Sequence, residues 1–369
     1  MFTWLPPIGA TCIPDDLWQV PWVARLESCP QDPVHHGEGN VLIHTKMVLE
    51  ALLKLPEFQQ LGREDQAVVW AACLLHDVAK PWTTKVEADG RITAKGHSAA
   101  GAKAARRILY DLNVHPPARE QVCALVRLHQ LPFFCTEGSA REAERKAILA
   151  SLSARSGLLA IVNDADGVGR ICPDSERLKT NVGLFRLLAE ELDILDAPYR
   201  FASAEARFVF CHNQEVDQYI APPERYRCEV VVMCGVPGSG KSTWVRKNLP
   251  GHKVVSLDQI RGELKIDPSD SQSAVAAEGR ERLKTHLRAS QDVVWDATNV
   301  TRDHRSRIIG VARDYGARIR IVQVEAPLQR LLQQNKSRTE RVPEQVVDKL
   351  LDKWEFPTLD EAHTVEHVF

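Results

Sequence analysis

The stretch Gly235-Val-Pro-Gly-Ser-Gly-Lys-Ser242 decides the fold of the C-terminal part of this chain. It follows an apolar run at 230–234 (VVVMC) and opens a segment of helical character. Glycines in such a loop let backbone N–H groups converge on phosphate oxygens at the N-terminus of a helix. The context predicts a loop for ATP or GTP with Mg²⁺, in which Lys241 is catalytic and contacts the β and γ phosphates, and Ser242 is a metal ligand. The loop residues expected to bind nucleotide are Gly235, Gly238, Ser239, Gly240, Lys241, Ser242 and Thr243.

Short apolar runs alternate with helical segments after this loop. They lie at 254–257 (VVSL), 293–295 (VVW) and 319–324 (IRIVQV). Near-continuous apolar strands separated by helices are typical of a parallel sheet that is covered on both faces. We therefore expect residues 227–369 to form an α/β domain with a parallel sheet.

The chain upstream of this domain has a different pattern. Apolar residues recur there with helical spacing and almost without strand-like alternation. The segments with this spacing are 41–55, 64–79, 97–112, 117–130, 142–152, 157–168 and 176–195. We predict two domains of different class, an all-α domain followed by the α/β domain. The expected parts of the N-terminal half are an irregular arm at 1–38 packed on the helical domain, the helical domain at 39–196, and an interdomain segment at 197–226.

The composition limits the class of protein. A chain of 369 residues is comfortable for two cores, and 44% hydrophobic with 26% charged residues is ordinary for a globular protein. The formal net charge of −2 excludes a polycation that would coat nucleic acid. Nine cysteines without C-x-x-C pairs fit a reducing compartment. Neither a signal peptide nor an apolar run of about 20 residues is evident, so we expect a cytoplasmic protein that does not enter a membrane.

The residue that would activate a phosphate acceptor is Asp258. It follows the second predicted strand, and a carboxylate at the C-terminal end of a parallel strand faces the ligand crevice. There it could accept the proton of an attacking hydroxyl. Arg261, three residues further on, lies on the same helical face and could hold a phosphate of the acceptor. The alternative is a helix N-cap aspartate followed by a solvent-exposed arginine.

Three further residues are candidates for the same site. Asp296 ends the third predicted strand, in VVWDATN, and could hold Mg²⁺ or orient the lysine, although a structural turn would also explain it. Arg338 and Arg341 lie in a polar segment between two predicted helices. A mobile lid can bring such arginines onto the transferred phosphoryl group, with Arg338 the better candidate for catalysis. A solvated charge run is the alternative.

These motifs together carry a resemblance to a known family. GVPGSGKS, SLDQIR at 256–261, WDATN at 295–299 and an arginine-bearing lid before Val342-Pro343 resemble the phage-type 5′-hydroxyl polynucleotide kinase module. The resemblance implies that Asp258 is the general base, that Arg261 binds the 3′ phosphate of the acceptor nucleotide, and that Arg338 contacts the donor phosphates. The lid departs from the family pattern, because Gln334 stands where a further arginine is expected.

Histidines and aspartates emerge from the apolar helices of the N-terminal half. Buried imidazoles and carboxylates are costly unless they are paired or bind a metal, and their combination suits Mn²⁺, Fe, Co or Ni. The candidate ligands are His44, the doublet His76-Asp77, His97, His129, and one of Asp164 and Asp166. Asp164 and Asp166 are two residues apart on a helix and point in different directions, so only one should be a ligand.

The series His44, His76, Asp77 and Asp166 resembles the HD phosphohydrolase superfamily. The segment ADGVGR at 165–170 makes Asp166 the preferred fourth ligand. His97 and His129 resemble the HD subgroup found at the ends of tRNA nucleotidyltransferases, and could bind a second metal or contact the substrate phosphate. His35 and His36 are ambiguous. One or two divalent transition metals would activate water and neutralise charge on the phosphate oxygens.

An HD domain followed by a polynucleotide kinase module resembles the bacterial HD-Pnk family of nucleic-acid end-healing enzymes. The resemblance implies a kinase for 5′-hydroxyl ends and a phosphoesterase for 2′,3′-cyclic, 2′- or 3′-phosphate ends of RNA or DNA, with a separate ligase as the next enzyme.

Two other readings remain open at this stage. One is a small-molecule kinase, for a nucleoside or a sugar, fused to an antagonistic phosphatase. A basic, aromatic-bearing groove on the acceptor side would favour a polynucleotide over a small molecule, and its candidate arginines are Arg261, Arg302, Arg305 and Arg307. The other is a degenerate HD module that only binds a regulatory nucleotide, which the presence of every expected ligand argues against.

Overall fold

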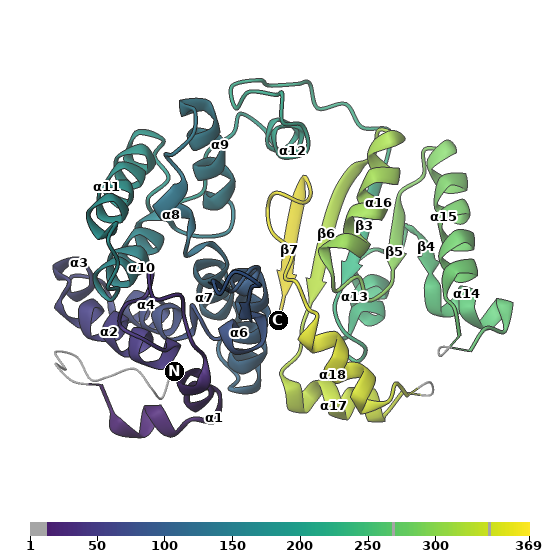
Figure 1. Cartoon of the computed structure of the whole chain (residues 1–369). Helices are drawn as coiled ribbons and strands as arrows, with labels where there is room; N and C mark the ends of the chain where they lie inside the picture. Colours follow the sequence, from purple (N-terminus) through teal and green to yellow (C-terminus); the bar gives the residue numbers. More distant parts are fainter. Residues whose placement is uncertain (1–12, 268–269, 339–340) are drawn as a thin grey trace. The chain divides into compact units, whose positions relative to one another are not determined.

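The computed structural model describes residues 13–267, 270–338 and 341–369. The chain divides between Tyr199 and Arg200 into two compact units (Figure 1). The first unit is almost entirely helical, and the second is built on a parallel sheet. The predicted order, an all-α part followed by an α/β part, is confirmed.

The first unit, called the helical unit below, contains one small hairpin of β1 (Lys85–Val86) and β2 (Ile92–Thr93), which the sequence pattern missed. A two-residue strand is too short to show alternation. The helices of the unit are η1 (Asp15–Gln19), α1 (Pro21–Ala24), η2 (Arg25–Ser28), α2 (Val41–Lys54), α3 (Pro56–Gln59), α4 (Arg63–Leu75), α5 (Lys80–Thr83), α6 (His97–Asp111), α7 (Pro116–Leu128), α8 (Leu131–Phe134), α9 (Ala140–Ser151), α10 (Ser156–Val168) and α11 (Ser175–Glu191).

Helix α4 forms the centre of the helical unit. Every residue from Ala67 to Leu75 is buried, and the helix packs against α2, α7 and α10. A helix that is apolar on all sides is stable only when neighbours surround it. The chain leaves this core at His76, the C-cap residue of α4. The doublet His76-Asp77 is therefore presented from the middle of the unit.

Local signals explain where the neighbouring helices begin and how closely they pack. The side chain of Asn40 caps α2 by accepting from the Ile43 N–H. Helix α9 begins with a reciprocal capping box between Ser139 and Glu142. At the end of α10, a Cβ atom on Gly169 would lie 2.6 Å from the Val48 backbone. Glycine at this position lets α10 lie directly against α2.

The second unit, called the sheet unit below, has five parallel strands in the order β4-β5-β3-β6-β7. The edge strand β7 was not predicted, because its sequence TVEHV lacks a continuous apolar run. The elements of the unit are α12 (Ala204–His212), β3 (Glu229–Cys234), α13 (Lys241–Asn248), β4 (Lys253–Ser256), α14 (Leu257–Leu264), α15 (Ser273–Arg288), β5 (Val293–Asp296), α16 (Arg302–Asp314), β6 (Arg318–Val324), α17 (Leu328–Lys336), α18 (Glu344–Asp352) and β7 (Thr364–Val368).

Alternate residues of the central strands face two separate hydrophobic clusters. Val230 and Val232 pack on one face with α12, α15 and α16, whereas Val231 and Met233 pack on the other face with α13. Burial on both faces explains why the strands read as continuous apolar runs. The carboxyl ends of β3, β4 and β5 lead into the segments that carry the predicted nucleotide and acceptor residues.

Residues 204–212 of the expected interdomain segment form α12, which packs within the sheet unit. Phe208 joins the cluster on one face of the sheet and stacks on His363. Arg207 donates to the carbonyl oxygens of Leu359 and His363. This segment therefore helps to close the sheet unit on the side of β6 and β7.

No helix among the described residues combines the length and the apolar character that crossing a membrane requires. None of the cysteines in the described part forms a disulfide.

Candidate functional sites

The predicted metal-binding side chains of the helical unit lie together and are buried. His44 comes from α2, His76 and Asp77 from the turn after α4, and Asp166 from α10. His97 and His129 lie at the start of α6 and the end of α7, and they are also buried. Four separate helices and one turn thus supply one cluster of imidazoles and carboxylates.

One half of this cluster contains His44, His76, Asp77 and Asp166. The Nε2 atoms of His44 and His76 are 3.2 Å apart, and Asp166 Oδ1 lies 3.1 Å from His44 Nε2. Asp77 Oδ2 is 3.2 Å from His76 Nε2. The Nδ1 atom of His76 lies 2.7 Å from the Cys73 carbonyl oxygen. An Nδ1–H that donates to a carbonyl leaves the Nε2 lone pair for a cation.

The other half contains Asp77, His97 and His129. The Nε2 atoms of the two histidines are 3.2 Å apart, and they lie 3.4 and 3.9 Å from Asp77 Oδ1. Their Nδ1 atoms again face carbonyl oxygens, those of Ala94 and Val126. The same rule for the tautomer directs both Nε2 lone pairs toward Asp77.

Asp77 connects the two halves, and one of its oxygens indicates what they hold. Oδ1 is buried and has no hydrogen-bond partner among the described residues. A buried carboxylate oxygen without a partner is costly. Oδ2 faces His44 and His76, while Oδ1 faces His97 and His129. The donor set therefore fits two divalent cations that share Asp77, and the ligands would be His44, His76, Asp166, His97 and His129.

Charge controls protonation in this buried cluster. Burial raises the pKa of Asp77, but the Lys80 ammonium and His76 outweigh it and hold the pKa well below its usual range. Burial likewise raises the pKa of Asp166, but the charge of Arg170 and the hydrogen bond with His44 outweigh burial and hold this pKa well below its usual range. Burial lowers the pKa of His129 to about 3. Ionised carboxylates and neutral imidazoles are the forms that bind a metal.

The structure separates the two candidate aspartates of α10. Asp166 points into the cluster, whereas Asp164 Oδ2 accepts from Arg186 at 2.5 Å. Neither aspartate belongs to the groups of described residues whose ligand atoms all lie close enough together to hold a metal ion, so it is the contact with His44 that distinguishes Asp166.

Two cations beside the cluster were not singled out from the sequence. Lys80 Nζ lies 2.7 Å from Asp77 Oδ2, and Arg170 donates to both oxygens of Asp166 at 2.9 and 3.0 Å. Their spacings of three and four residues from the aspartates are helical neighbour distances, so the sequence did contain a signal for both. Each of these cations is paired with one of the two ionised aspartates of the cluster.

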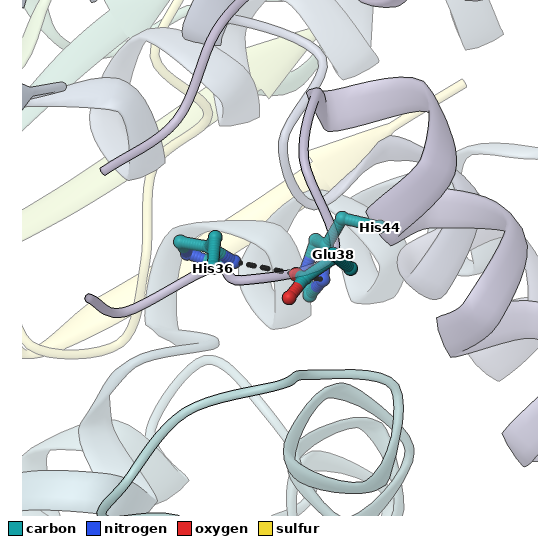
Figure 2. A group of neighbouring side chains, drawn as sticks. All are labelled: His36, Glu38 and His44. Carbon is teal, nitrogen blue, oxygen red and sulfur yellow. Dashed lines mark hydrogen bonds and ion pairs between the residues drawn. The ribbon is translucent and has the colours of Figure 1, made fainter. Parts of the chain in front are cut away.

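Glu38 was also missed. Its Oε1 atom lies 2.8 Å from the Nδ1 atoms of both His36 and His44 (Figure 2). Burial raises the pKa of Glu38, but these two imidazoles and the Ile171 N–H outweigh it and keep the carboxyl ionised. No local pattern predicts the contact with His44, because it joins an irregular segment to helix α2.

A pocket of about 390 Å³ adjoins the cluster in the helical unit. Its lining includes the metal-site residue His97, the cations Lys80 and Arg170, and the exposed ring of Phe134. This combination suits an anionic ligand with a planar group.

In the sheet unit, the glycine-rich loop runs from the end of β3 into α13. Gly235 and Gly238 have φ angles of 146° and 85°, which favour glycine. Lys241 Nζ donates to the carbonyl oxygens of Gly235 and Val236 at 2.8 and 3.1 Å. The lysine thus folds back over its own loop, where the phosphates of a nucleotide would lie.

Ser242 and Asp296 meet at the carboxyl ends of β3 and β5. The Ser242 hydroxyl donates to Asp296 Oδ2 at 3.0 Å. A hydroxyl and a carboxylate in contact beside a phosphate-binding loop are the oxygen ligands and orienting groups that Mg²⁺ uses.

Asp258 and its neighbours form the other side of this site. Asp258 is the second residue of α14, and its Oδ1 lies 2.5 Å from Arg261 Nη1. Arg338 Nη2 is 3.7 Å from Asp258 Oδ2. The structure therefore brings the proposed base and both arginines together. Arg341 instead contacts Glu344 at 3.1 Å.

Two glutamines support this site, and their roles were not anticipated. Gln272 Oε1 accepts from Arg261 Nε at 2.8 Å, while its amide group donates to the Asp267 and Asp270 carbonyls. The amide of Gln334 can be oriented so that its nitrogen donates to the Gly238 carbonyl oxygen at 2.6 Å and its oxygen accepts from Arg330 Nε at 3.2 Å. The residue that stands in place of an expected arginine thus joins α17 to the glycine-rich loop.

Three arginines suggested for an acceptor groove have other partners. Arg305 is fully buried and pairs with Glu361. Arg302 pairs with Asp360. Arg307 pairs with Asp303 through an exposed contact. These contacts do not assemble a basic groove from the three side chains.

Comparison with known protein families matches each half separately. The family model described as HD domain matches residues 41–167, and the one described as AAA domain matches residues 230–357. The chain therefore combines an N-terminal HD domain with a C-terminal, kinase-like P-loop domain.

Curated relatives also match one part of the chain at a time. An L-seryl-tRNA(Sec) kinase of Methanococcus maripaludis is 22% identical over 35% of this chain and 53% of its own length. A multifunctional CCA protein of Halorhodospira halophila is 32% identical over 30% of this chain and 24% of its own length. The chain thus spans about half of the first relative and a quarter of the second. Among solved structures, a sugar kinase of Janibacter sp. matches with a TM-score of 0.30 and 18% sequence identity. The match covers 38% of this chain and 85% of the sugar kinase chain.

Proposed function

We propose that this chain is a bifunctional, cytoplasmic end-healing enzyme for RNA or DNA. Its P-loop domain transfers a phosphoryl group from an NTP to a 5′-hydroxyl end. Its HD domain removes phosphate from a 2′,3′-cyclic, 2′- or 3′-phosphate end with divalent transition metals. A separate ligase would then join the healed ends.

The arrangement of Asp258 and Arg261 carries the kinase half of the proposal. A carboxylate within 2.5 Å of a guanidinium, on the acceptor side of a phosphate-binding loop, provides a base for a hydroxyl and a cation for an adjacent phosphate. A 5′-terminal nucleotide that carries a 3′ phosphodiester offers both groups. Lys241 and Arg338 would neutralise charge on the transferred phosphoryl group, and Ser242 and Asp296 would hold or orient Mg²⁺.

The buried cluster around Asp77 carries the hydrolytic half. Metals bound there would lower the pKa of a water molecule and polarise the phosphoester. The protein's own contribution is to keep the two carboxylates ionised and His129 neutral. Lys80 and Arg170 would bind the oxygens of the phosphate that leaves.

The main alternative is a kinase for a nucleoside or a sugar fused to a phosphatase. Arg302, Arg305 and Arg307 each pair with a different carboxylate and do not form a basic groove. This observation is compatible with a small-molecule acceptor. One relative is named as a kinase of an aminoacyl-tRNA, which makes an RNA acceptor compatible with a domain of this type. We favour the polynucleotide because the Asp258–Arg261 pair matches a hydroxyl and a phosphate on one molecule.

A substrate panel separates the two functions. An oligoribonucleotide with a 5′-hydroxyl and a 2′,3′-cyclic phosphate should gain a 5′ phosphate with ATP or GTP and Mg²⁺, and should lose its cyclic phosphate with Mn²⁺. Mononucleosides and free sugars should be phosphorylated at least about a hundredfold more slowly, because they lack the phosphate that Arg261 would hold. Rapid phosphorylation of a nucleoside with no change at either end of the oligonucleotide would establish the alternative.

A further inference from the structure

Glu38 lies at the centre of a hydrogen-bonding arrangement that reaches into the metal-binding cluster. Its Oε1 atom is 2.8 Å from His36 Nδ1 and 2.8 Å from His44 Nδ1. Figure 2 shows the two imidazoles converging on this carboxylate. The side chain of Glu38 is almost completely shielded from solvent and is 1% exposed.

The partners of each imidazole determine where its proton lies. His44 Nδ1 faces two acceptors, Glu38 Oε1 and the Gly169 carbonyl oxygen at 3.2 Å. A nitrogen between two acceptors must carry the hydrogen. His36 Nε2 faces the Lys80 ammonium at 3.5 Å, which is a donor. His36 therefore also carries its hydrogen on Nδ1, and this hydrogen is donated to Glu38.

The consequence for His44 is direct. With its hydrogen on Nδ1, His44 presents the Nε2 lone pair toward His76, Asp77 and Asp166. The other tautomer would direct an N–H at the place where a cation belongs. A carboxylate that fixes the tautomer and the ring orientation of a liganding histidine raises its affinity for metal.

The three residues could instead be read as a metal site of their own, because their ligand atoms lie close together. That reading requires His44 to bind one ion through Nδ1 and a second through Nε2. A neutral imidazole has only one free lone pair, so His44 would have to lose both of its hydrogens. The hydrogen-bonded arrangement needs no such step and accounts for the same contacts.

The second oxygen of Glu38 is occupied as well. Oε2 accepts from the Ile171 N–H at 2.9 Å, and the Gly37 N–H donates to the Ile171 carbonyl oxygen at 2.8 Å. This pair of bonds joins residues 37–38 to the segment just after Asp166. The carboxylate therefore has a fixed position, which is the requirement for orienting another side chain.

We propose that Glu38 is a positioning residue for the metal site of the HD domain, acting by holding His44 and His36 in the Nδ1–H tautomer. The inference rests on the proposed function only in so far as it requires the metal site of the HD domain. It does not depend on which phosphoester that site cleaves. It assigns to the segment before α2 a direct part in building the site.

Glu38→Gln in the full chain tests the proposal. In the wild type, His36 and His44 face Glu38 Oε1, and the Ile171 N–H donates to Oε2. A glutamine amide has only one oxygen, so it cannot accept at both places, and at least one of these hydrogen bonds must be lost. Titration with Mn²⁺ by calorimetry should show an affinity reduced about ten- to a hundredfold, with the number of bound ions unchanged. Long-range ¹H–¹⁵N spectra of the metal-free protein should show Nδ1–H for His36 and His44 in the wild type and mixed tautomers in the variant.

Two further variants complete the experiment. Glu38→Asp keeps the charge and both oxygens but is shorter by one methylene, so its Mn²⁺ affinity should lie between those of the wild type and Glu38→Gln. Glu190→Gln removes an exposed carboxylate near the end of α11 and should bind Mn²⁺ like the wild type. If Glu38→Gln does not fold, the Glu38→Asp variant still provides both readouts.

Two results would overturn the proposal. One is wild-type Mn²⁺ affinity and unchanged tautomers in the Glu38 variants. The other is the loss of one bound ion with unchanged affinity for the rest, which would make Glu38 a ligand. Neither readout uses a substrate. If the wild-type protein processes no 2′,3′-phosphate end but Glu38→Gln weakens Mn²⁺ binding, the proposed activity fails while the role of Glu38 stands.

Discussion

The two candidate sites of this chain are built in opposite ways. In the helical unit, Asp77 and Asp166 are 2% and 1% exposed and are surrounded by imidazoles and cations. In the sheet unit, the side chain of Asp258 is 60% exposed, and that of Arg338 is 34% exposed. One site is enclosed by its own helices, and the other is open to solvent.

The difference follows from what each site must bind. A metal site gathers carboxylates and imidazoles in a dry interior, and only their mutual hydrogen bonds and neighbouring cations make this burial tolerable. A kinase site must admit a nucleotide and an acceptor. Its charged groups therefore remain solvated until the bound substrates displace the water. The sheet unit buries its paired ionisable groups elsewhere, in the Arg305–Glu361 pair and at His363, which faces Glu205.

The largest effect is expected from Asp77→Asn. Asp77 is shared by both halves of the metal cluster, so its loss should lower removal of the 2′,3′-phosphate by on the order of a thousandfold or more. Kinase activity of the same preparation should stay unchanged and serves as the folding control. Asp111→Asn, which removes an exposed carboxylate from the end of α6, should retain both activities. An equal loss of both activities in Asp77→Asn would show that the two sites depend on each other.

Asp258→Asn should have the next largest effect. Removing a general base from a phosphoryl transfer costs about a hundred- to ten-thousandfold in rate, whereas the buried metal site should remain fully active. The matched control is Asp303→Asn, an exposed carboxylate on α16 that pairs with Arg307. Steady-state 5′ phosphorylation of a 5′-hydroxyl oligonucleotide measures the effect. A kcat that stays within a few-fold of the wild type would remove Asp258 as the base and leave it only the partner of Arg261 in the first turn of α14, a helix that Ser256 caps.

The sequence predicted more of the open site than of the buried one. The glycine-rich loop follows the buried strand β3, and Asp258 and Arg261 follow the short apolar run of β4, an edge strand whose first two residues are exposed. Local patterns were therefore sufficient to find all three. The loop came from one short window of sequence, and the base and the arginine came together from a second, SLDQIR at 256–261. The strand β7 was missed because its alternating polar residues lack such a run.

For the buried site, the sequence singled out the side chains that the structure brings together but not the contacts that hold them in place. His44, His76, Asp77 and Asp166 are polar residues in apolar helices, which is a visible anomaly. The contacts of Glu38 with His44 and Ile171 span irregular segments and depend on tertiary packing. The same limit applies to Arg305, which was a candidate for a basic acceptor groove but which the fold buries against Glu361.

A pH experiment examines the buried polar groups of the sheet unit. The Ile319 N–H donates to His363 Nδ1 at 3.0 Å, so this buried histidine is neutral, and burial lowers its pKa below 6.5. The unfolded state then binds more protons than the folded state once the pH falls through about 6.5. The free energy of unfolding of the sheet unit should decrease on acidification, by at most about 1.4 kcal/mol per pH unit from this group.

Calorimetry between pH 7.5 and 5.5 measures this slope. The transition of the sheet unit is the one that ATP and Mg²⁺ shift upward. His363→Gln cannot take up the proton and should have a shallower pH dependence, whereas His304→Gln, at an exposed position on α16, should behave like the wild type. Identical slopes in the wild type and His363→Gln would mean that His363 does not titrate in this range.

The smallest effect is expected at Asp164, the neighbour of the proposed metal ligand Asp166. Asp164 pairs with Arg186 at a partly exposed position, so Asp164→Asn should change the free energy of unfolding by no more than about 1 kcal/mol and leave phosphoesterase activity within about twofold. Asp166→Asn, two residues away, should lose most Mn²⁺ binding, because Asp166 Oδ1 faces His44 Nε2 at 3.1 Å. The two variants make the same chemical change on one helix and differ only in the direction of the side chain. Comparable losses of Mn²⁺ binding in both variants would mean that helix α10 presents a different face to the metal. Asp164 would then belong to the enclosed site.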